Sequence, residues 1–147
     1  MKRPEEAIQR ELCAELRIRL MPPWMFWSTP NGGARTKAEA GILKATGVKA
    51  GIPDLFVCGP DHIREETRAG VEGVRWTAPK LIALELKAPP KLGPRGASKA
   101  KPRVSPAQRE VINALAQCGV PTLLVRDVDE VLRGLAQMGV PLRGRTP

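Results

Sequence analysis

Apolar residues near the amino terminus recur at the spacing of a helix. Ile8, Leu12 and Leu16 lie four residues apart, which predicts a helix over residues 4–20 with one buried face. Pro4 suits the first turn of such a helix because its missing N–H group needs no partner there. The pair of prolines that follows ends the helix, since proline cannot continue the hydrogen-bond ladder.

Short apolar or aromatic runs bounded by proline and glycine predict the remaining strands. These strands cover residues 24–29, 55–58, 81–88 and 120–125. Further helices are predicted over 36–46, closed by Gly47, over 105–117, opened by a Ser105–Gln108 capping box, and from Asp127 or Asp129 to about Met138. The order α-β-α-β-β-α-β-α predicts an α/β fold with a small mixed sheet between helices.

The chain length fits one domain over residues 1–147. Two segments lack a regular pattern. Residues 59–79 mix glycine, proline and charges, which indicates a surface excursion. Residues 89–104 form a basic loop rich in proline and glycine, in which no acidic residue offsets the lysines and arginines.

The formal net charge of +9 and the pI near 10.1 favour nucleic acid as the partner. No apolar stretch reaches the ~18 residues that a membrane span needs, and no signal-peptide core follows the amino terminus. Cys13, Cys58 and Cys118 are too far apart in sequence for a CxxC zinc motif or a disulfide framework. We therefore expect a cytoplasmic protein with no membrane partner.

Two charged residues interrupt the apolar strand predicted at 81–88. Side chains alternate between the faces of a strand, so Glu85 and Lys87 share one face and the large aliphatic residues share the other. A carboxylate and an ammonium group are costly to desolvate in such a run unless something compensates them. A divalent cation and a phosphate group would compensate both charges. An exposed face of an edge strand is the alternative interpretation.

Asp54 gives the strand at 81–88 a possible acidic neighbour. The residue follows Pro53 directly before the predicted strand at 55–58, where an isolated aspartate is typical of a turn. Proteins bind Mg²⁺ through one or two carboxylates, together with waters and substrate oxygens. If the two strands are adjacent, Asp54 and Glu85 provide such a pair. The pattern predicts a divalent-cation site, for which Mg²⁺ and Mn²⁺ are both candidates.

Several short motifs occur in an order that identifies a family resemblance. Pro53-Asp54 and then Glu85-Leu86-Lys87 match the signature of the PD-(D/E)XK nucleases. The flanking motifs are Asn31-Gly32-Gly33-Ala34-Arg35, a run from Leu43-Lys44 through Gly47 and Gly51 to Leu55, Ser105 with Gln108, and a first-helix acid with Gln9. Residues 5–126 thus resemble the VRR-NUC branch of that superfamily, of the stand-alone phage and bacterial type. The stretch between Asp54 and Glu85 is longer than a minimal hairpin requires.

The resemblance implies a restriction-endonuclease-like fold and a Mg²⁺-dependent DNA endonuclease. The implied metal ligands are Asp54, Glu85 and the Leu86 carbonyl oxygen, supported by Glu5 or Glu6. Lys87 is implied to orient the attacking water or to stabilise charge on the phosphate, with Gln108 beside it. The resemblance also implies branched DNA, such as a Holliday junction, as substrate, a homodimer, and a phage-encoded origin in a bacterial host.

Some of these residues have a second explanation in the sequence itself. Gln108 is the N3 residue of a capping box, and Glu5 and Glu6 both suit the dipole of the first helix turn. The expected nucleic-acid contacts are Asn31, Arg35, Lys44, Lys91, Arg95, Lys99, Lys101 and Arg103. Isolated lysines and arginines of this kind also occur on protein surfaces without any ligand, because water solvates their charges.

Two other functions compete with the nuclease. The first is a non-catalytic nucleic-acid-binding module that retains the fold. The second is a small basic ribosome-associated or structural protein, for which no clustering of Asp54, Glu85 and Lys87 is expected.

Overall fold

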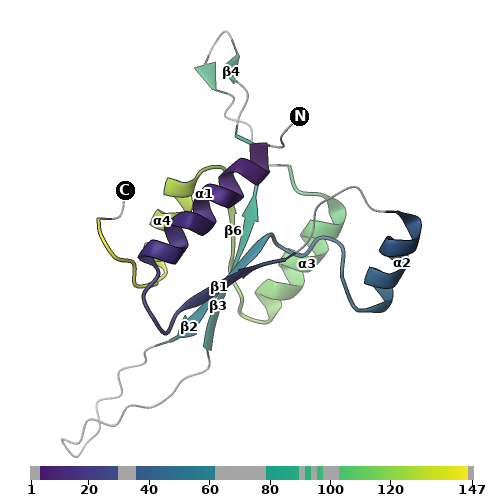
Figure 1. Cartoon of the computed structure of the whole chain (residues 1–147), viewed down its shortest axis with the longest axis horizontal. Coiled ribbons are helices and arrows are strands. Elements are labelled where there is room, and N and C mark those ends of the chain that lie inside the picture. Colours follow the sequence, from purple (N-terminus) through teal and green to yellow (C-terminus); the bar gives the residue numbers. More distant parts are fainter. Residues whose placement is uncertain are drawn as a thin grey trace, which may run out of the picture.

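The computed structural model describes residues 4–29, 36–61, 79–89, 92–93, 96–97 and 103–145. Apart from two additional short strands, β4 and β5, the elements there follow the predicted order (Figure 1). They are α1 (Pro4–Arg19), β1 (Met25–Ser28), α2 (Lys37–Ala45), β2 (Leu55–Pro60), β3 (Pro79–Leu86), β4 (Leu92–Gly93), β5 (Gly96–Ala97), α3 (Pro106–Gln117), β6 (Thr122–Val125) and α4 (Val128–Gln137). The predicted α/β class is confirmed.

Four strands form a mixed sheet in the order β1-β2-β3-β6. The β1–β2 and β2–β3 pairs are antiparallel, whereas β3 and β6 are parallel and are connected through α3. In the β2–β3 pair Leu55 lies opposite Leu84. This register brings Asp54, the residue before β2, to the end of β3 that carries Glu85.

The hydrophobic core fills the space between one face of the sheet and the helices α1 and α4. Leu12 and Leu16 of α1 and Leu132 and Leu135 of α4 are almost fully buried there. The alternate residues of β2 and β3, from Leu55 and Val57 to Ile82, Leu84 and Leu86, complete this core. α3 covers the opposite face, on which Glu85 lies (Figure 1).

The caps of α3 and α4 occur where the sequence predicts them, and α2 begins with a capping box that the sequence analysis does not predict. Ser105 and Gln108 form both bonds of the capping box that begins α3, and Thr36 and Glu39 form the equivalent pair in α2. Asp127 accepts a hydrogen bond from the N–H group of Glu130 at 2.7 Å. Asp127, not Asp129, is therefore the N-cap of α4.

The strand boundaries differ from the prediction where tertiary pairing decides them. β3 ends at Leu86, so the prediction that Lys87 lies within the strand is wrong. The N–H of Leu86 bonds to the Asp54 carboxylate in place of a backbone carbonyl, and that of Lys87 bonds to the Val125 carbonyl. β2 extends to Pro60 and β3 begins at Pro79, so the two strands include both ends of the excursion predicted at 59–79. Residues 62–78 lie outside the described residues.

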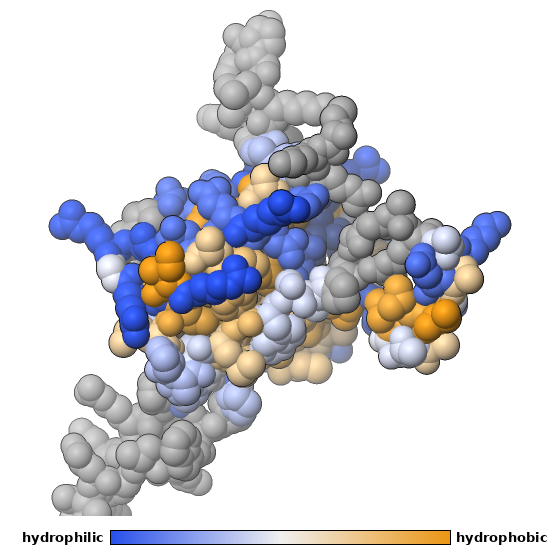
Figure 2. Space-filling view, viewed as in Figure 1, coloured by the Kyte–Doolittle hydropathy of each residue, from blue (hydrophilic) through white to orange (hydrophobic). Residues whose placement is uncertain are grey.

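The basic loop predicted at 89–104 contains the two short strands β4 and β5, which pair with each other. The sequence pattern does not predict this hairpin, because two-residue strands have no detectable alternation. The helix α2, in contrast, is amphipathic but has no buried residue, and apolar side chains gather on the surface over it (Figure 2). No helix in the described part of the chain is long and apolar enough to span a membrane.

Candidate active site

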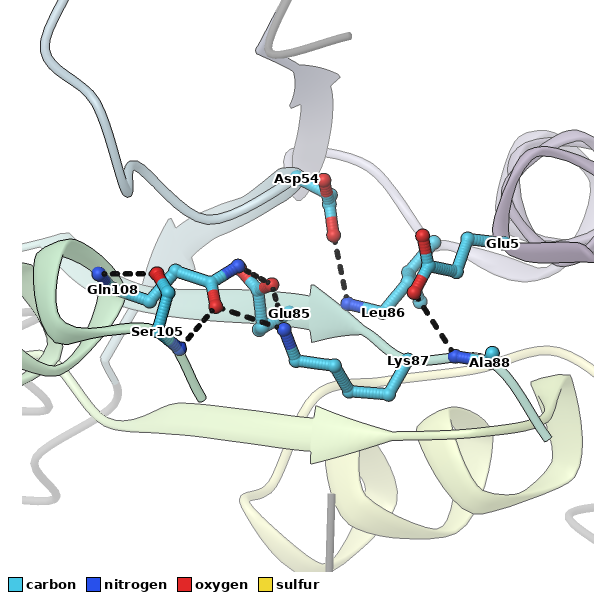
Figure 3. Close-up of polar contacts among 8 residues, drawn as sticks. All are labelled: Glu5, Asp54, Glu85, Leu86, Lys87, Ala88, Ser105 and Gln108. Atoms are coloured by element: carbon cyan, nitrogen blue, oxygen red, sulfur yellow. Dashed lines mark hydrogen bonds and ion pairs between the residues drawn. The ribbon is translucent and has the colours of Figure 1, made fainter. Parts of the chain in front are cut away.

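Asp54 lies at the junction between the loop after α2 and the first residue of β2. Its Oδ2 atom accepts a hydrogen bond of 2.8 Å from the N–H group of Leu86 on the neighbouring strand (Figure 3). On the other side, the N–H group of Thr29 donates to the Asp54 carbonyl oxygen at 2.9 Å. Leu86 of β3 therefore holds the side chain of Asp54, and Thr29, directly after β1, holds its backbone.

Glu85 is the one polar or charged residue among those described that is almost fully buried, with 2% of its surface exposed. Its Oε1 atom accepts hydrogen bonds from the Lys87 ammonium group at 2.8 Å and from the side-chain amide of Gln108. Its Oε2 atom is buried and has no hydrogen-bond partner. An unpartnered buried carboxylate oxygen costs free energy, typically about 1–3 kcal/mol, which indicates a site for a ligand.

Lys87 and Gln108 form a small network with Glu85. The Lys87 ammonium group also donates to the side-chain oxygen of Gln108 at 3.0 Å, and that same oxygen accepts from the N–H group of Ser105. Gln108 therefore caps α3 and contacts the charged pair at the same time (Figure 3). The capping role of Gln108 and its predicted place beside the active site are therefore compatible, and the capping box fixes its position.

The structure distinguishes the two acidic residues of the first turn of α1. Glu5 Oε1 accepts a hydrogen bond of 3.1 Å from the N–H group of Ala88, directly after Lys87 (Figure 3). Glu6 instead forms an exposed ion pair of 2.6 Å with Arg10, one turn further along the same helix. Of the two acids, Glu5 is the one beside the candidate site.

Burial raises the pKa of both central carboxyl groups. For Asp54, the hydrogen bond from Leu86 and the charge of Lys87 oppose the effect of burial, while Glu5 adds to it. For Glu85, burial is again the largest cause, the hydrogen bond from Lys87 opposes it, and the negative charge of Asp54 raises the pKa further. For both carboxyl groups, burial and neighbouring negative charge thus outweigh the stabilisation of the ionised form by Lys87 and by hydrogen bonds.

The residues present fit a hard divalent cation. Such an ion takes oxygen ligands. The Oε2 atom of Glu85, which has no hydrogen-bond partner, lies on β3, and the carboxylate of Asp54 lies directly before the adjacent strand β2. The described residues contain no group of three or more histidine, cysteine, aspartate or glutamate side chains arranged to hold a metal ion. The fit therefore depends on two carboxylates with backbone and solvent oxygens, which is the usual composition of a Mg²⁺ site.

Comparisons with known proteins agree with this architecture. No protein-family model matches the chain, and no curated protein matches it. A solved structure described as a VRR_NUC domain protein matches with a TM-score of 0.56 and 20% sequence identity, over 96% of this chain and 93% of the other. The chain has the VRR-NUC fold. The likeness extends across nearly the whole chain, and at this level of identity it concerns the fold.

In this VRR-NUC fold, the loop that carries Asp54 rests against the start of α3. Gly51 has a positive φ of 82°, and a Cβ atom there would lie 2.5 Å from the carbonyl carbon and oxygen of Ala107. It would also lie 2.7 Å from the backbone nitrogen of Gln108. Only glycine allows the Asp54 loop and the Gln108 helix to approach this closely.

Gly51→Ala is therefore expected to destabilise the protein for two reasons. An alanine at a positive φ has a strained backbone, which costs on the order of 1–3 kcal/mol. Overpacking against Ala107 should add about 1–3 kcal/mol. Gly47→Ala is the matched control, because Gly47 has a φ of 90° and no atom within 4 Å of the added methyl group. Urea unfolding of both variants measures the difference. Equal losses of stability would contradict the contact between the loop and α3.

The predicted nucleic-acid contacts are only partly described by the structure. Lys44 lies on the exposed surface of α2, and Arg103 is exposed two residues before Ser105. The structure gives neither side chain a contact with the Asp54–Glu85 cluster. The others, Asn31, Arg35, Lys91, Arg95, Lys99 and Lys101, lie outside the described residues.

Thr29 is a residue of the site that the sequence does not single out. Its hydroxyl group donates to the Pro53 carbonyl oxygen, and its N–H group donates to the carbonyl of Asp54. A threonine at the end of a short strand carries no local signal of such a role, because the contact spans more than twenty residues of sequence. Only the pairing of β1 with β2 creates it.

Proposed function

We propose that this chain is a metal-dependent nuclease that hydrolyses phosphodiester bonds in DNA. The observation that carries the proposal is the buried Glu85 carboxylate, whose Oε2 atom lacks a partner while Lys87 and Gln108 bind Oε1. Asp54 directly precedes the adjacent strand β2, and its charge raises the pKa of Glu85. The fold shared with a VRR_NUC domain protein supports the same assignment.

Asp54 and Glu85 would hold a divalent cation, Mg²⁺ or Mn²⁺, together with the Leu86 carbonyl oxygen. Such an ion acts as a Lewis acid on phosphate oxygens and lowers the pKa of water. Glu5 would support the ion through its position beside Ala88. The buried carboxylates are costly to ionise without that partner, which favours binding of a cation at neutral pH.

Lys87 is the residue that would contact the reacting phosphate. Its side chain is 12% exposed, so most of the ammonium group's water has already been removed. A positive charge held in such a site stabilises the negative charge that develops on phosphate without reorganisation of solvent. Gln108 holds the Lys87 ammonium group through its side-chain oxygen, which fixes the direction in which the charge acts.

The charge of the protein supports nucleic acid as the substrate. A net charge of +9 on 147 residues favours binding to phosphate backbones through release of counterions, and such binding weakens as salt rises. We further propose branched DNA as the preferred substrate and a homodimer as the active form. Both follow from the resemblance of the sequence motifs, and paired cuts across a branched duplex require two sites.

A non-catalytic nucleic-acid-binding module with the same fold is the second candidate. One observation favours it: the described residues contain no set of three acidic, histidine or cysteine side chains arranged around a common metal position. In that case the Glu85–Lys87 ion pair is a structural element, and Asp54 serves only to bond the Leu86 N–H group.

A cleavage assay distinguishes the two functions. The purified protein is incubated with Holliday junctions, flaps, nicked duplexes and linear DNA, in Mg²⁺, in Mn²⁺ and in EDTA. We expect cleavage that requires the metal and that is greatest on the branched substrates. The same products in EDTA as in Mg²⁺, or no product from any substrate with either metal, would contradict the proposal.

A further inference from the structure

An aromatic pair lies on the sheet outside the cluster of charged residues. The rings of Trp27 on β1 and Phe56 on β2 are stacked, with centroids 5.6 Å apart and an angle of 17° between their planes. Phe56 is buried, whereas Trp27 is 40% exposed. The other described tryptophan, Trp24, is part of the hydrophobic core. Trp27 is therefore an aromatic ring supported by a second ring and open to solvent.

The register of the sheet places this pair on the same face as the candidate active site. Trp27 lies opposite Phe56, and Phe56 lies opposite Ala83. Ala83 and Glu85 are two residues apart on β3, so their side chains point to the same face. Neighbouring strands are about 4.8 Å apart and successive residues about 3.4 Å, which places the Trp27 backbone about 12 Å from that of Glu85.

The helix α3 covers only part of this face. It contacts Glu85 through Gln108, and it packs beside β6. At the opposite edge of the sheet, β1 exposes both Trp27 and Met25, which lie two residues apart and therefore share this face. This face is thus exposed at the edge strand, at Met25 and Trp27, whereas Phe56 and Ala83, which lie between Trp27 and Glu85, are buried.

We propose that Trp27, supported by Phe56, is a stacking platform for an unpaired base of a nucleic-acid strand whose phosphate lies at the Glu85–Lys87 cluster. This inference rests on the proposed nuclease function and specifies its substrate: a strand that is single-stranded or splayed beside the cut. Bases stack on exposed aromatic rings with little sequence preference, because every base has a π-face. A base within a duplex is already stacked and cannot use such a ring.

The position of Trp27 favours a nucleobase over a protein partner as the occupant. The backbones of Trp27 and Glu85 are about 12 Å apart, a separation that a few nucleotides of a single strand can span. The strongly basic chain adds the electrostatic attraction that a strand's phosphates require. The backing ring Phe56 keeps the plane of Trp27 fixed, which reduces the entropy lost when a base stacks on it.

The test uses oligonucleotides that carry 2-aminopurine, a base whose fluorescence is quenched when it stacks. They are presented as single strands and as blunt duplexes to the full chain in EDTA, so binding is measured without cleavage. The variants are Trp27→Leu, which keeps an apolar side chain over Phe56, and Trp27→Phe, which keeps a ring. Met25→Ala is the matched control, because Met25 is 58% exposed on the same strand and face.

We expect Trp27→Leu to bind the single strand about tenfold to a hundredfold more weakly and to lose the quenching. Trp27→Phe should retain most of both signals, and Met25→Ala and duplex binding should change little. Equal single-strand binding by the native protein and Trp27→Leu would overturn the inference. So would a change of oligomeric state in Trp27→Leu without loss of quenching, since it would assign the surface to a second copy of the chain.

The two proposals fail separately in this design. Metal-dependent cleavage by a protein whose Trp27→Leu variant binds and quenches normally would overturn the stacking site and leave the nuclease intact. Quenching that depends on Trp27, in a protein that cleaves nothing, would support the stacking site and overturn the nuclease. Thermal unfolding of each variant establishes that it is folded before binding is compared.

Discussion

Replacement of Lys87 by methionine is expected to reduce DNA cleavage at least a hundredfold. The substitution keeps the apolar stem and removes the ammonium group that bonds Glu85 at 2.8 Å and Gln108 at 3.0 Å. Loss of one preorganised group that stabilises developing negative charge typically costs about 10²- to 10³-fold in rate. DNA binding should change little, because one phosphate contact among many is lost.

The matched control for Lys87→Met is Lys49→Met. Lys49 forms an exposed ion pair with Glu110 at 3.2 Å, so its removal changes the net charge equally without touching the cluster. Single-turnover cleavage and equilibrium binding to the same substrate are measured for both variants. Cleavage by Lys87→Met within a few-fold of that by Lys49→Met would show that the ammonium group has no part in the reaction.

Asp54→Asn is expected to lower the cleavage activity and to raise the stability of the protein. Mutation of a residue that hydrogen-bonds to a metal ligand typically lowers activity by about 10- to 100-fold. Loss of the ligand itself should lower the activity further. The melting temperature, in contrast, should rise. The side-chain oxygen of the introduced asparagine can still accept the hydrogen bond from the Leu86 N–H group, while the cost of a buried negative charge beside Glu85 and Glu5 disappears.

The pH dependence of that stabilisation follows from the raised pKa of Asp54. A carboxyl group whose pKa is raised in the folded state binds its proton more tightly there than in the unfolded chain. Below the ordinary pKa of 3.8 the group is protonated in both states, so native protein and variant should be equally stable. As the pH rises through the raised pKa, the native protein becomes less stable than Asp54→Asn. Thermal unfolding at acidic and neutral pH, without divalent metal, measures this; a variant less stable than the native chain at neutral pH would contradict it.

Much of the fold is predictable from local sequence. The spacing of Ile8, Leu12 and Leu16 predicts α1, and the Ser105–Gln108 capping box predicts the start of α3 within a residue. The apolar run around Glu85 predicts β3 and identifies the residue as unusual. These features are predictable because helix periodicity, capping and strand alternation depend on residues that are close in sequence.

The parts that were not predictable depend on contacts between distant segments. Local sequence does not choose between Glu5 and Glu6, because the N–H group of Ala88, with which Glu5 bonds, is on another element. Nor does it show that Trp24 is buried and Trp27 exposed, since both belong to one aromatic run. The end of β3 at Leu86 likewise depends on Asp54, whose side chain takes the place of the next backbone partner.

A crystal of the protein soaked in Mn²⁺ tests the central claim most directly, because Mn²⁺ is located by its anomalous scattering. The account predicts a peak between the carboxylates of Asp54 and Glu85, at ligand distances of about 2 Å from their oxygens. The peak should be absent from an Asp54→Asn crystal treated in the same way. A native crystal with no anomalous density within reach of either carboxylate, at a Mn²⁺ concentration that supports cleavage in solution, would contradict the account.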